Sequence, residues 1–288
     1  MCRMYGLRAT HATRVDCSLV HAQNALLLQS FLDEDGNPNR HGWGIGTYDA
    51  GGHPRVEKDA SSATQSNRFR EAAARAVSDT IVSHVRRASM GGHTMPNTHP
   101  FLHKRMLFAH NGTIGAFSKM RRRLLAALSP ESRAAIQGQT DSEHLFHYLI
   151  ARLEPVREDA PRPAPKPPRE MAEALRDGLL QVIEWSRELD PAATLALNVL
   201  WTDGKKLVGS RYHRTMHYLV RRGATLCPVC GEKHADTSDG RLYRSVAVAS
   251  EATTDEEWIE IPDESVFAID PEEAFWAQPL AIDPAATV

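Results

Sequence analysis

The order of strand-like and helix-like segments restricts the fold of this chain more than any other feature. Segments typical of strands, with frequent β-branched residues or alternating apolar ones, are found at 2–8, 80–86, 106–110, 194–201, 205–210, 216–221, 242–250 and 266–270. Segments typical of helices are found at 16–30, 64–77, 117–128, 140–153 and 169–189. Strands gathered before and after a block of helices favour two antiparallel sheets with helices outside them, and disfavour an alternating βαβ fold.

Two of the expected helices have recognisable beginnings. Asp16 is expected to cap the helix at 16–30, in which Cys17 would be a small core residue. Thr140 and Glu143 have the spacing of a capping box. Helix initiation alone therefore explains part of this second stretch.

Glycines in two places predict special backbone geometry. Asn111-Gly112 follows the strand-like segment 106–110 and favours a tight turn with positive φ that ends this strand. Three glycines surround Trp43 in the sequence His-Gly-Trp-Gly-Ile-Gly. They indicate either a strand that backbone or ligand approaches closely, or a strand that simply packs around the Trp side chain.

Composition argues against several classes of partner. The 288 residues carry a formal net charge of −2, which gives no indication of a nucleic-acid-binding surface. No apolar run approaches the roughly 18 residues of a membrane span, and the N-terminal region lacks a signal-peptide core. The four cysteines, Cys2, Cys17, Cys227 and Cys230, do not have the number and scatter of a disulfide framework. A cytoplasmic protein without nucleic-acid or membrane partners is expected.

The second residue is a candidate nucleophile. Removal of Met1, which a small second residue permits, would leave Cys2 with a free α-amine beside its thiol. Such an amine has a pKa of roughly 7.7–8.0, so a fraction of it is neutral near pH 7 and can accept the thiol proton. One residue would then serve as both nucleophile and base. A cysteine at this position can also be an accident, and the later motifs decide between the two.

Three later motifs follow Cys2 in order: Ser83–Ser89 (SHVRRAS), His110–Thr113 (HNGT) and Thr140–Glu143 (TDSE). Together the four stretches resemble the class II glutamine amidotransferases, the cysteine branch of the N-terminal-nucleophile (Ntn) hydrolases. The motifs end near residue 150, and the strand-rich remainder is compatible with the rest of such a domain. The resemblance implies an α+β fold, a four-layer αββα sandwich of two antiparallel sheets.

The resemblance also implies roles for five residues. Cys2 would attack a side-chain amide and form a γ-glutamyl thioester. Asn111, through its side-chain amide, and Gly112, through its backbone N–H, would form the oxyanion hole. Arg86 would bind the α-carboxylate of the substrate, and Asp141 its α-ammonium group. The reaction would be acyl transfer to water with release of ammonia or an amine, and no cofactor would be required for catalysis.

Each of these motif residues also has a structural interpretation. Arg86 can be a surface strand residue, Asp141 an acid favoured by the dipole at a helix start, and Asn111-Gly112 only a hairpin. All three structural interpretations would have to be correct at the same time, which favours the functional interpretation. The histidines of this region are expected to be structural and satisfied by hydrogen bonds: His84, His99 and His110.

One glutamine amidotransferase domain is expected at 2–275, with a tail at 276–288. A proline-rich surface loop at 155–168 and a Cys-x-x-Cys hairpin at 225–236 would belong to this domain. The chain has no room for the synthase domain that larger amidotransferases carry, so it resembles the small stand-alone members. Some of these hydrolyse γ-glutamyl compounds, and others supply ammonia to a separate enzyme.

Three functions are compatible with these features. The first is a glutaminase-type amidohydrolase that acts on glutamine or a γ-glutamyl compound, with a separate ammonia-accepting enzyme as a possible partner. The second is a γ-glutamyl amide or peptide hydrolase in a small-thiol pathway. The third is a non-catalytic binding or regulatory protein on the same fold, with Cys227 and Cys230 as its working part.

A second chemical signal is Cys227-Pro-Val-Cys230-Gly, which is half of a zinc knuckle. His234 or His217 could supply further ligands, but a structural zinc normally has four, and no second Cys pair is present. A reduced thiol pair in a surface hairpin and a redox pair are the alternatives. A catalytic zinc is less compatible, because the chemistry of Cys2 already accounts for hydrolysis.

Overall fold

The computed structural model describes residues 2–32, 36, 38–153, 168–223, 226–270 and 274–281. Its strands form a seven-stranded and a six-stranded sheet, and every strand pair is antiparallel. The first sheet has the order β11 (Ile259–Glu260), β9 (His217–Arg222), β10 (Arg244–Ala249), β1 (Arg3–Arg14), β4 (Val77–Val85), β2 (Trp43–Tyr48), β3 (Pro54–Asp59). The second sheet has the order β13 (Ala274–Pro279), β12 (Ser265–Asp270), β8 (Leu207–Arg211), β7 (Leu195–Thr202), β6 (Met106–Ile114), β5 (Phe101–His103).

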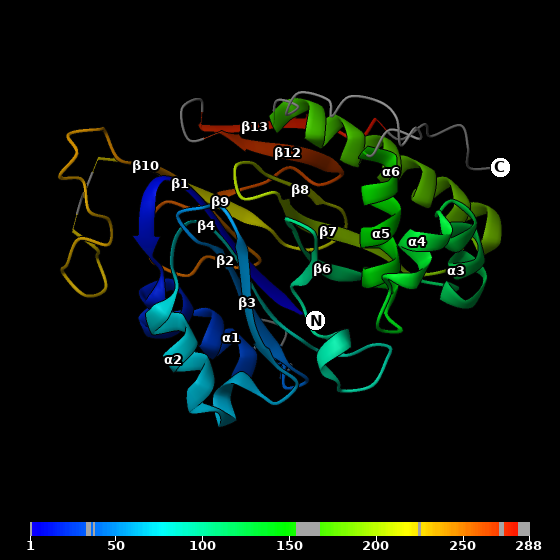
Figure 1. The fold of residues 1–288 in the computed structure, drawn as a ribbon, viewed down its shortest axis with the longest axis horizontal. Helices are drawn as coiled ribbons and strands as arrows, with labels where there is room; N and C mark the ends of the chain where they lie inside the picture. Colours follow the sequence, from blue (N-terminus) through cyan, green and yellow to red (C-terminus); the bar gives the residue numbers. More distant parts are fainter. Residues whose placement is uncertain are drawn as a thin grey trace.

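Helices cover the outer face of each sheet (Figure 1). The α-helices are α1 (Leu26–Phe31), α2 (Asn67–Arg75), α3 (Phe117–Ala126), α4 (Pro130–Ala134), α5 (Asp141–Leu153) and α6 (Pro168–Leu189). Short π- and 3₁₀-helices are η1 (Cys17–His21), η2 (Ala63–Gln65) and η3 (Met95–Asn97).

Three hydrophobic cores separate the four layers. The inner core lies between the sheets, where Met4 and Val82 of the first sheet share a cluster with Leu200 and Phe267 of the second. A second core joins α3, α5 and α6 to the six-stranded sheet, and a third joins η1, α1 and α2 to the seven-stranded sheet. The αββα sandwich of two antiparallel sheets is thereby confirmed.

The helix expected at 16–30 is wrong, because the segment is divided into η1 and α1. Asp16 has no side-chain cap bond. Between the two helices, the Asn24 side chain donates to Glu251 Oε2 (3.1 Å) and to the carbonyl oxygen of Ala252 (2.9 Å). These tertiary bonds hold the chain in a non-helical conformation that local propensity does not reveal.

The tight turn expected at Asn111-Gly112 is also wrong. β6 continues through both residues, with Asn111 opposite Asn198 and Gly112 opposite Leu197 on β7. A Cβ at residue 112 would collide with the carbonyl oxygen of Ala196. Glycine is therefore needed here for close packing within the sheet and not for a positive φ.

The two alternatives around Trp43 are also decided by close contacts. A Cβ at Gly44 would collide with the carbonyl oxygen of His99, so backbone approaches this strand. The Trp43 side chain is also buried and packs edge-on against Phe69 of α2.

At the start of α5, only half of the expected capping box forms. The Glu143 N–H donates to Thr140 Oγ1 (3.2 Å), while the Glu143 carboxylate accepts from two earlier backbone N–H groups.

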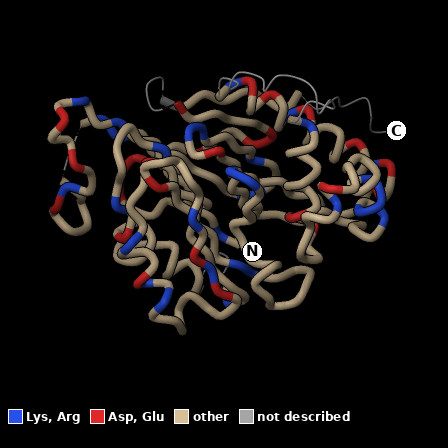
Figure 2. The backbone as a smooth tube through the Cα atoms, viewed as in Figure 1, with Lys and Arg blue, Asp and Glu red and all other residues tan. Residues whose placement is uncertain are grey.

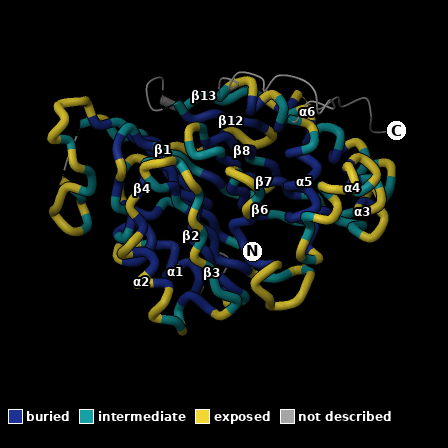
Figure 3. The backbone as a smooth tube through the Cα atoms, in the orientation of Figure 1, coloured by how far each residue is buried: buried dark blue, intermediate teal, exposed yellow. Residues whose placement is uncertain are grey.

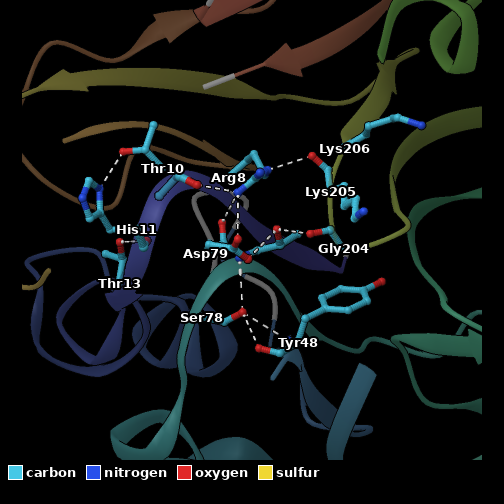
Figure 4. Close-up of polar contacts among 12 residues, drawn as sticks. Arg8, Thr10, His11, Thr13, Tyr48, Ser78, Asp79, Gly204, Lys205 and Lys206 are labelled. Atoms are coloured by element: carbon cyan, nitrogen blue, oxygen red, sulfur yellow. Dashed lines mark hydrogen bonds and ion pairs between the residues drawn. The ribbon is translucent and has the colours of Figure 1, made fainter. Parts of the chain in front are cut away.

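A polar network joins the two sheets near the middle of β1 (Figure 4). Arg8 Nε donates to the carbonyl oxygen of Lys205 (2.9 Å), and Thr80 Oγ1 donates to that of Gly204 (2.9 Å). The pairing of β1 with β4 shifts in register between Arg8 and Thr13, so the last part of β1 pairs with β4 beyond an irregularity. Cys2 precedes one end of β1 and Cys17 follows the other.

Some expected boundaries fall at the edge of the described residues. Nearly all of the proline-rich segment 155–168 lies outside them, and so does the chain beyond residue 281. β13 extends the six-stranded sheet to Pro279, past the boundary expected at residue 275. In the part of the chain that is described, no helix combines the length and apolarity needed to cross a membrane. Lys and Arg are interspersed with Asp and Glu along the described chain (Figure 2).

Candidate active site

Cys2 lies at the start of β1 with its thiol held by one residue of the neighbouring loop. The Arg87 N–H donates to Cys2 Sγ (3.2 Å), and the thiol donates to the Arg87 carbonyl oxygen (3.3 Å). Burial raises the pKa of Cys2, and the backbone hydrogen bond from Arg87 and the charge of Arg86 lower it in part. The net direction is upward, so the thiol needs a base before it can act as a nucleophile.

Cys2, Asn111 and Gly112 line one open pocket of about 360 Å³, called here the Cys2 pocket. Its remaining lining residues are Arg87, Ala88, Ser89, Thr113 and Arg214. The structure thus brings together the three residues for which sequence predicted nucleophile and oxyanion roles. β6 supplies two of them from the second sheet, while Cys2 belongs to the first.

The direction of the Gly112 N–H follows from the pattern of β6. The Ile114 N–H donates to the Asp141 carboxylate (2.8 Å) and not to β7. N–H groups two residues apart on a strand point to the same edge, so the Gly112 N–H also points away from β7. The neighbour on that side, β5, pairs only with Met106–Phe108. The Gly112 N–H is therefore directed to an edge that β5 does not cover.

Arg86 is buried directly after β4 and does not line the Cys2 pocket. Its guanidinium donates to the carbonyl oxygens of Met90 (2.8 Å), Gly92 (3.1 Å) and His41 (3.5 Å). A guanidinium has five N–H donors, so two are left after these bonds. These bonds hold the loop that follows Arg86 against the Arg86 guanidinium.

Asp141 is buried at the first position of α5 and also lies outside the pocket lining. Its carboxylate accepts from the N–H groups of Ile114 and Ser142, both at 2.8 Å. Burial raises the pKa of Cys2, and the negative charge of Asp141 adds to that shift. Burial lowers the pKa of Arg86, and the charges of Cys2 and Asp141 oppose that shift in part. Met90 lies between the two predicted head-group residues, because its sulfur accepts from the Asp141 N–H (3.4 Å) while its carbonyl oxygen binds Arg86.

The histidines behind the pocket differ from expectation. His110 is satisfied, since Nδ1 meets Ser142 Oγ (2.9 Å) and Nε2 meets the Ala196 carbonyl oxygen (3.0 Å). The expectation is wrong for His84 and His99, whose ring nitrogens are buried and find no hydrogen-bond partner among the described residues. Their rings lie 4.1 Å apart, and burial lowers the pKa of His84 to about 3 and that of His99 well below its usual value. Both are neutral near pH 7 and unsuited to act as bases there.

The cysteines expected in a surface hairpin gather with a residue that sequence reasoning placed in the core. Cys17, Cys227, Cys230 and His234 form a group whose ligand atoms all lie within 4.8 Å of one another, called here the Cys/His cluster. His217, the other histidine considered, is on β9 and does not belong to the group found among the described residues. Cys17 was missed because its nearest partners are remote in the sequence.

Sequence reasoning also missed Arg214, which lies between β8 and β9 in no recognisable motif. It lines the Cys2 pocket, and its Nε is buried without a hydrogen-bond partner among the described residues. An unpaired buried guanidinium N–H is costly, which makes this group a candidate to meet a ligand.

Comparison with known proteins decides the family. The model of the family "Glutamine amidotransferases class-II" matches residues 1–269. The chain belongs to the class II glutamine amidotransferases. Members of this family cleave the side-chain amide of glutamine without a cofactor, and this general activity applies to the present chain.

Individual relatives agree with this membership. "Probable glutamine amidotransferase DUG3" of Saccharomyces cerevisiae is 29% identical over 301 residues, covering 93% of this chain and 82% of the yeast protein. A solved glutamine aminotransferase class-II domain protein from Silicibacter pomeroyi superposes with a TM-score of 0.60 at 22% identity, over 96% of this chain and 99% of that one. Glutamine phosphoribosylpyrophosphate amidotransferase of Bacillus subtilis superposes with a TM-score of 0.59 at 14% identity, and 98% of this chain covers only 50% of that protein. The two solved structures support the fold alone.

Proposed function

We propose that this protein is a glutaminase-type amidohydrolase that cleaves the γ-amide of glutamine or of a γ-glutamyl compound through a thioester on Cys2. The observation that carries the proposal is the shared pocket of Cys2, Asn111 and Gly112. A nucleophile and two donors for a developing oxyanion are what acyl transfer from an amide needs.

In the first half-reaction, the α-amine exposed by removal of Met1 takes the thiol proton of Cys2. The thiolate attacks the amide carbon, a C–S bond forms, and the carbonyl oxygen becomes an oxyanion. The Asn111 side chain and the Gly112 N–H stabilise this oxygen. Collapse breaks the C–N bond, and the leaving amine takes the proton from the α-ammonium group of Cys2.

In the second half-reaction, water attacks the thioester, with the same α-amine as base. The same two donors stabilise the second oxyanion, and the C–S bond breaks to give glutamate and the free thiol. The cycle consumes one water and releases one ammonia or amine, with no redox change. No described histidine is needed as a base, in agreement with the low pKa of His84.

Arg86 and Asp141 are proposed to read the amino-acid head of the substrate. Support comes from their charges, both of which act on the Cys2 thiol. The two N–H donors that Arg86 has left could donate to a carboxylate, and further donors would be released if Met90 and Gly92 moved away with their loop. Recognition of a zwitterion would then be coupled to a movement of residues 87–92.

The test is a substrate screen on protein whose loss of Met1 is shown by intact mass. Glutamate release from glutamine and from γ-glutamyl amides is measured, and a glutamine-like diazoketone should add once, to Cys2. Cys2→Ala is the matched control and should neither react with the reagent nor release glutamate. Labelling of Cys17, Cys227 or Cys230 instead of Cys2, or full activity with Met1 retained, would contradict the proposal.

A second candidate, a γ-glutamyl amide or peptide hydrolase, is favoured by one observation. Arg214 lines the Cys2 pocket with a buried Nε that has no hydrogen-bond partner in the described part of the chain, and the exposed Arg87 lies on the same lining. Two guanidinium groups beside the nucleophile would favour a substrate whose leaving amine carries a carboxylate.

The two candidates separate on matched substrates. For γ-glutamyl-glycine against γ-glutamyl-methylamide, Arg214→Gln should reduce the preference for the carboxylate-bearing substrate by about 10–100-fold, the usual worth of a charged hydrogen bond. Hydrolysis of glutamine should change much less. If wild type shows no preference, the glutaminase candidate stands alone, and the released ammonia would serve a separate acceptor enzyme. The four unpaired thiols are compatible with the cytoplasmic location proposed for either enzyme.

A further inference from the structure

We infer that Cys17, Cys227, Cys230 and His234 bind one structural zinc ion that fastens an exposed loop to the end of β1 away from the nucleophile. The ligand atoms of this Cys/His cluster all lie within 4.8 Å of one another. Cys₃His is an established ligand set for tetrahedral structural zinc. With Zn–S bonds of about 2.3 Å, the edge of the tetrahedron is about 3.8 Å, so the four donors need to close only slightly.

Local geometry in the loop has the features of a zinc knuckle. The Cys227 N–H donates to the Glu232 carbonyl oxygen (2.8 Å), and the Gly231 N–H donates to that of Cys227 (2.9 Å). Gly231 has a φ of 73°, which the reversal of the chain after Cys230 requires. The Val229 N–H points at Cys227 Sγ (3.4 Å), as backbone amides do around a metal-bound thiolate.

Cys17 is brought to this loop by contacts that do not depend on metal. The Arg14 N–H donates to the His234 carbonyl oxygen (2.9 Å), and Thr13 forms a β-bridge with Ala235. Thr13 Oγ1 also meets the Tyr243 hydroxyl (3.2 Å). The cluster is therefore preorganised, and Cys17, the first residue of η1, is buried beside the two thiols of the loop.

The charge and the space of the cluster also suit zinc. Three thiolates and a neutral imidazole around Zn²⁺ carry a net charge of −1, and Arg14 lies beside them with its Nη2 at 3.8 Å from Cys230 Sγ. Cys17, Cys227 and His234 line a cavity of about 50 Å³, and Cys230 Sγ lies 3.2 Å from His234 Nε2.

The loop at 226–242 needs a stabilising link to the sandwich because it has no hydrophobic core of its own. Residues 226–242 project from the sandwich, and none of them is buried (Figure 3). A segment that cannot bury apolar side chains is commonly held by disulfides or by a metal. All three cysteines of the cluster are free thiols in the structure, and together with His234 they offer a metal four ligands, which favours the second.

The zinc would take no part in amide hydrolysis. Cys2 and Cys17 stand at opposite ends of β1, whose 12 residues span roughly 35–40 Å at the rise of an extended strand. The four protein ligands also fill all four coordination positions of the zinc, which leaves no open position for water or substrate. The role assigned is that of a closed structural site.

The test is the zinc content of the full chain, produced with zinc in the medium and purified without chelator. About one zinc per chain is expected by elemental analysis. Cys17→Ser and Cys227→Ser should lose it, whereas Cys2→Ser, which removes a thiol elsewhere, and His217→Gln should keep it. Less than a tenth of an equivalent in wild type, or full zinc in Cys17→Ser, would overturn the site.

Two further measurements keep the inference testable if the variants fold poorly. Cobalt added to chelator-treated wild type should give thiolate-to-metal charge transfer and tetrahedral d–d bands. In the zinc-loaded protein a thiol reagent should reach only Cys2, and after chelation also the loop thiols Cys227 and Cys230. A spectrum without thiolate ligation, or a Cys227–Cys230 disulfide in freshly purified protein, would show that no metal is bound there.

Discussion

The two ends of β1 carry thiols in opposite environments. Before β1, Cys2 lines an open pocket, and among the described residues its sulfur forms hydrogen bonds only with the backbone of Arg87. After β1, Cys17 is buried among two more thiols and an imidazole. A single thiol beside oxyanion donors can attack a substrate, while converging thiols share a metal and are withdrawn from reaction. The neighbours of a cysteine, more than its position on the strand, decide its chemistry.

The largest effect expected from this comparison is a separation of activity from metal content. Cys2→Ala should abolish glutamate release and leave zinc unchanged, because the Cys2 thiol is the proposed nucleophile and lies far from the cluster. Cys227→Ser should lose zinc and thermal stability, but keep kcat per folded molecule. Steady-state kinetics, elemental analysis and thermal unfolding measure the three quantities. Equal loss of activity in both variants, with folded protein shown by circular dichroism, would mean that the two ends are not independent.

The next effect concerns the donors beside Cys2. Asn111→Ala should lower kcat about 10²–10³-fold, roughly 2.7–4 kcal/mol, because one oxyanion donor is lost. KM should change much less, since the ground-state amide needs this donor less than the intermediate does. Thr113→Ala, at a neighbouring position of the same pocket, is the matched control and should keep most of the activity. Near-normal kcat in folded Asn111→Ala, with chemistry rate-limiting, would remove Asn111 from the oxyanion hole.

A smaller effect is expected for Arg86, whose charge acts on Cys2 although the residue does not line the Cys2 pocket. Arg86→Lys should raise KM for glutamine about 10–100-fold, because a point charge cannot replace a bidentate guanidinium. Hydrolysis of glutaramide, which lacks the α-carboxylate, should respond much less. The adjacent Arg87→Lys serves as control. If both substrates lose equally, Arg86 acts only by holding Met90 and Gly92, and the carboxylate site lies elsewhere.

Sequence predicted the layers better than the details of either site. The helices at 117–128, 140–153 and 169–189 and most strands were foreseen, because their periodic patterns reflect burial on one face or two. The helix at 16–30 failed, since Asn24 makes tertiary bonds that its neighbours in sequence cannot announce. The turn at Asn111-Gly112 failed because pairing with β7 overrides local preference.

The two sites were predictable to different degrees for a related reason. The residues of the Cys2 pocket that belong to short motifs could be named from sequence, whereas Arg214, which belongs to none, could not. In the Cys/His cluster, three of the four residues lie within one short stretch and were recognised. Cys17 reaches them only through the bulged course of β1 and its bridge to Ala235, which are tertiary features.

The smallest effect concerns the buried histidines behind the active-site end. His84, opposite Met4 on the neighbouring strand, has its pKa lowered to about 3 by burial. The unfolded chain binds the proton near pH 6.5, so the native state binds fewer protons between about pH 6.5 and 3. The contribution of His84 to the free energy of unfolding is therefore greatest above pH 6.5. It falls as the pH drops from about 6.5 towards 3, by at most about 1.4 kcal/mol per pH unit.

His84→Phe should therefore reduce the acid sensitivity of folding while preserving most of the packing against His99. At pH 7 the change should cost little, since it removes two buried nitrogens that have no hydrogen-bond partner within the described ranges. Urea midpoints at pH 7 and pH 5 measure the slope, and His53→Gln, at an exposed position, should leave it as in wild type. An unchanged slope in His84→Phe would place the acid-sensitive group elsewhere. A reduced slope with zinc content unchanged at both pH values would show that acid weakens the Cys2 end of β1 before it reaches the metal end.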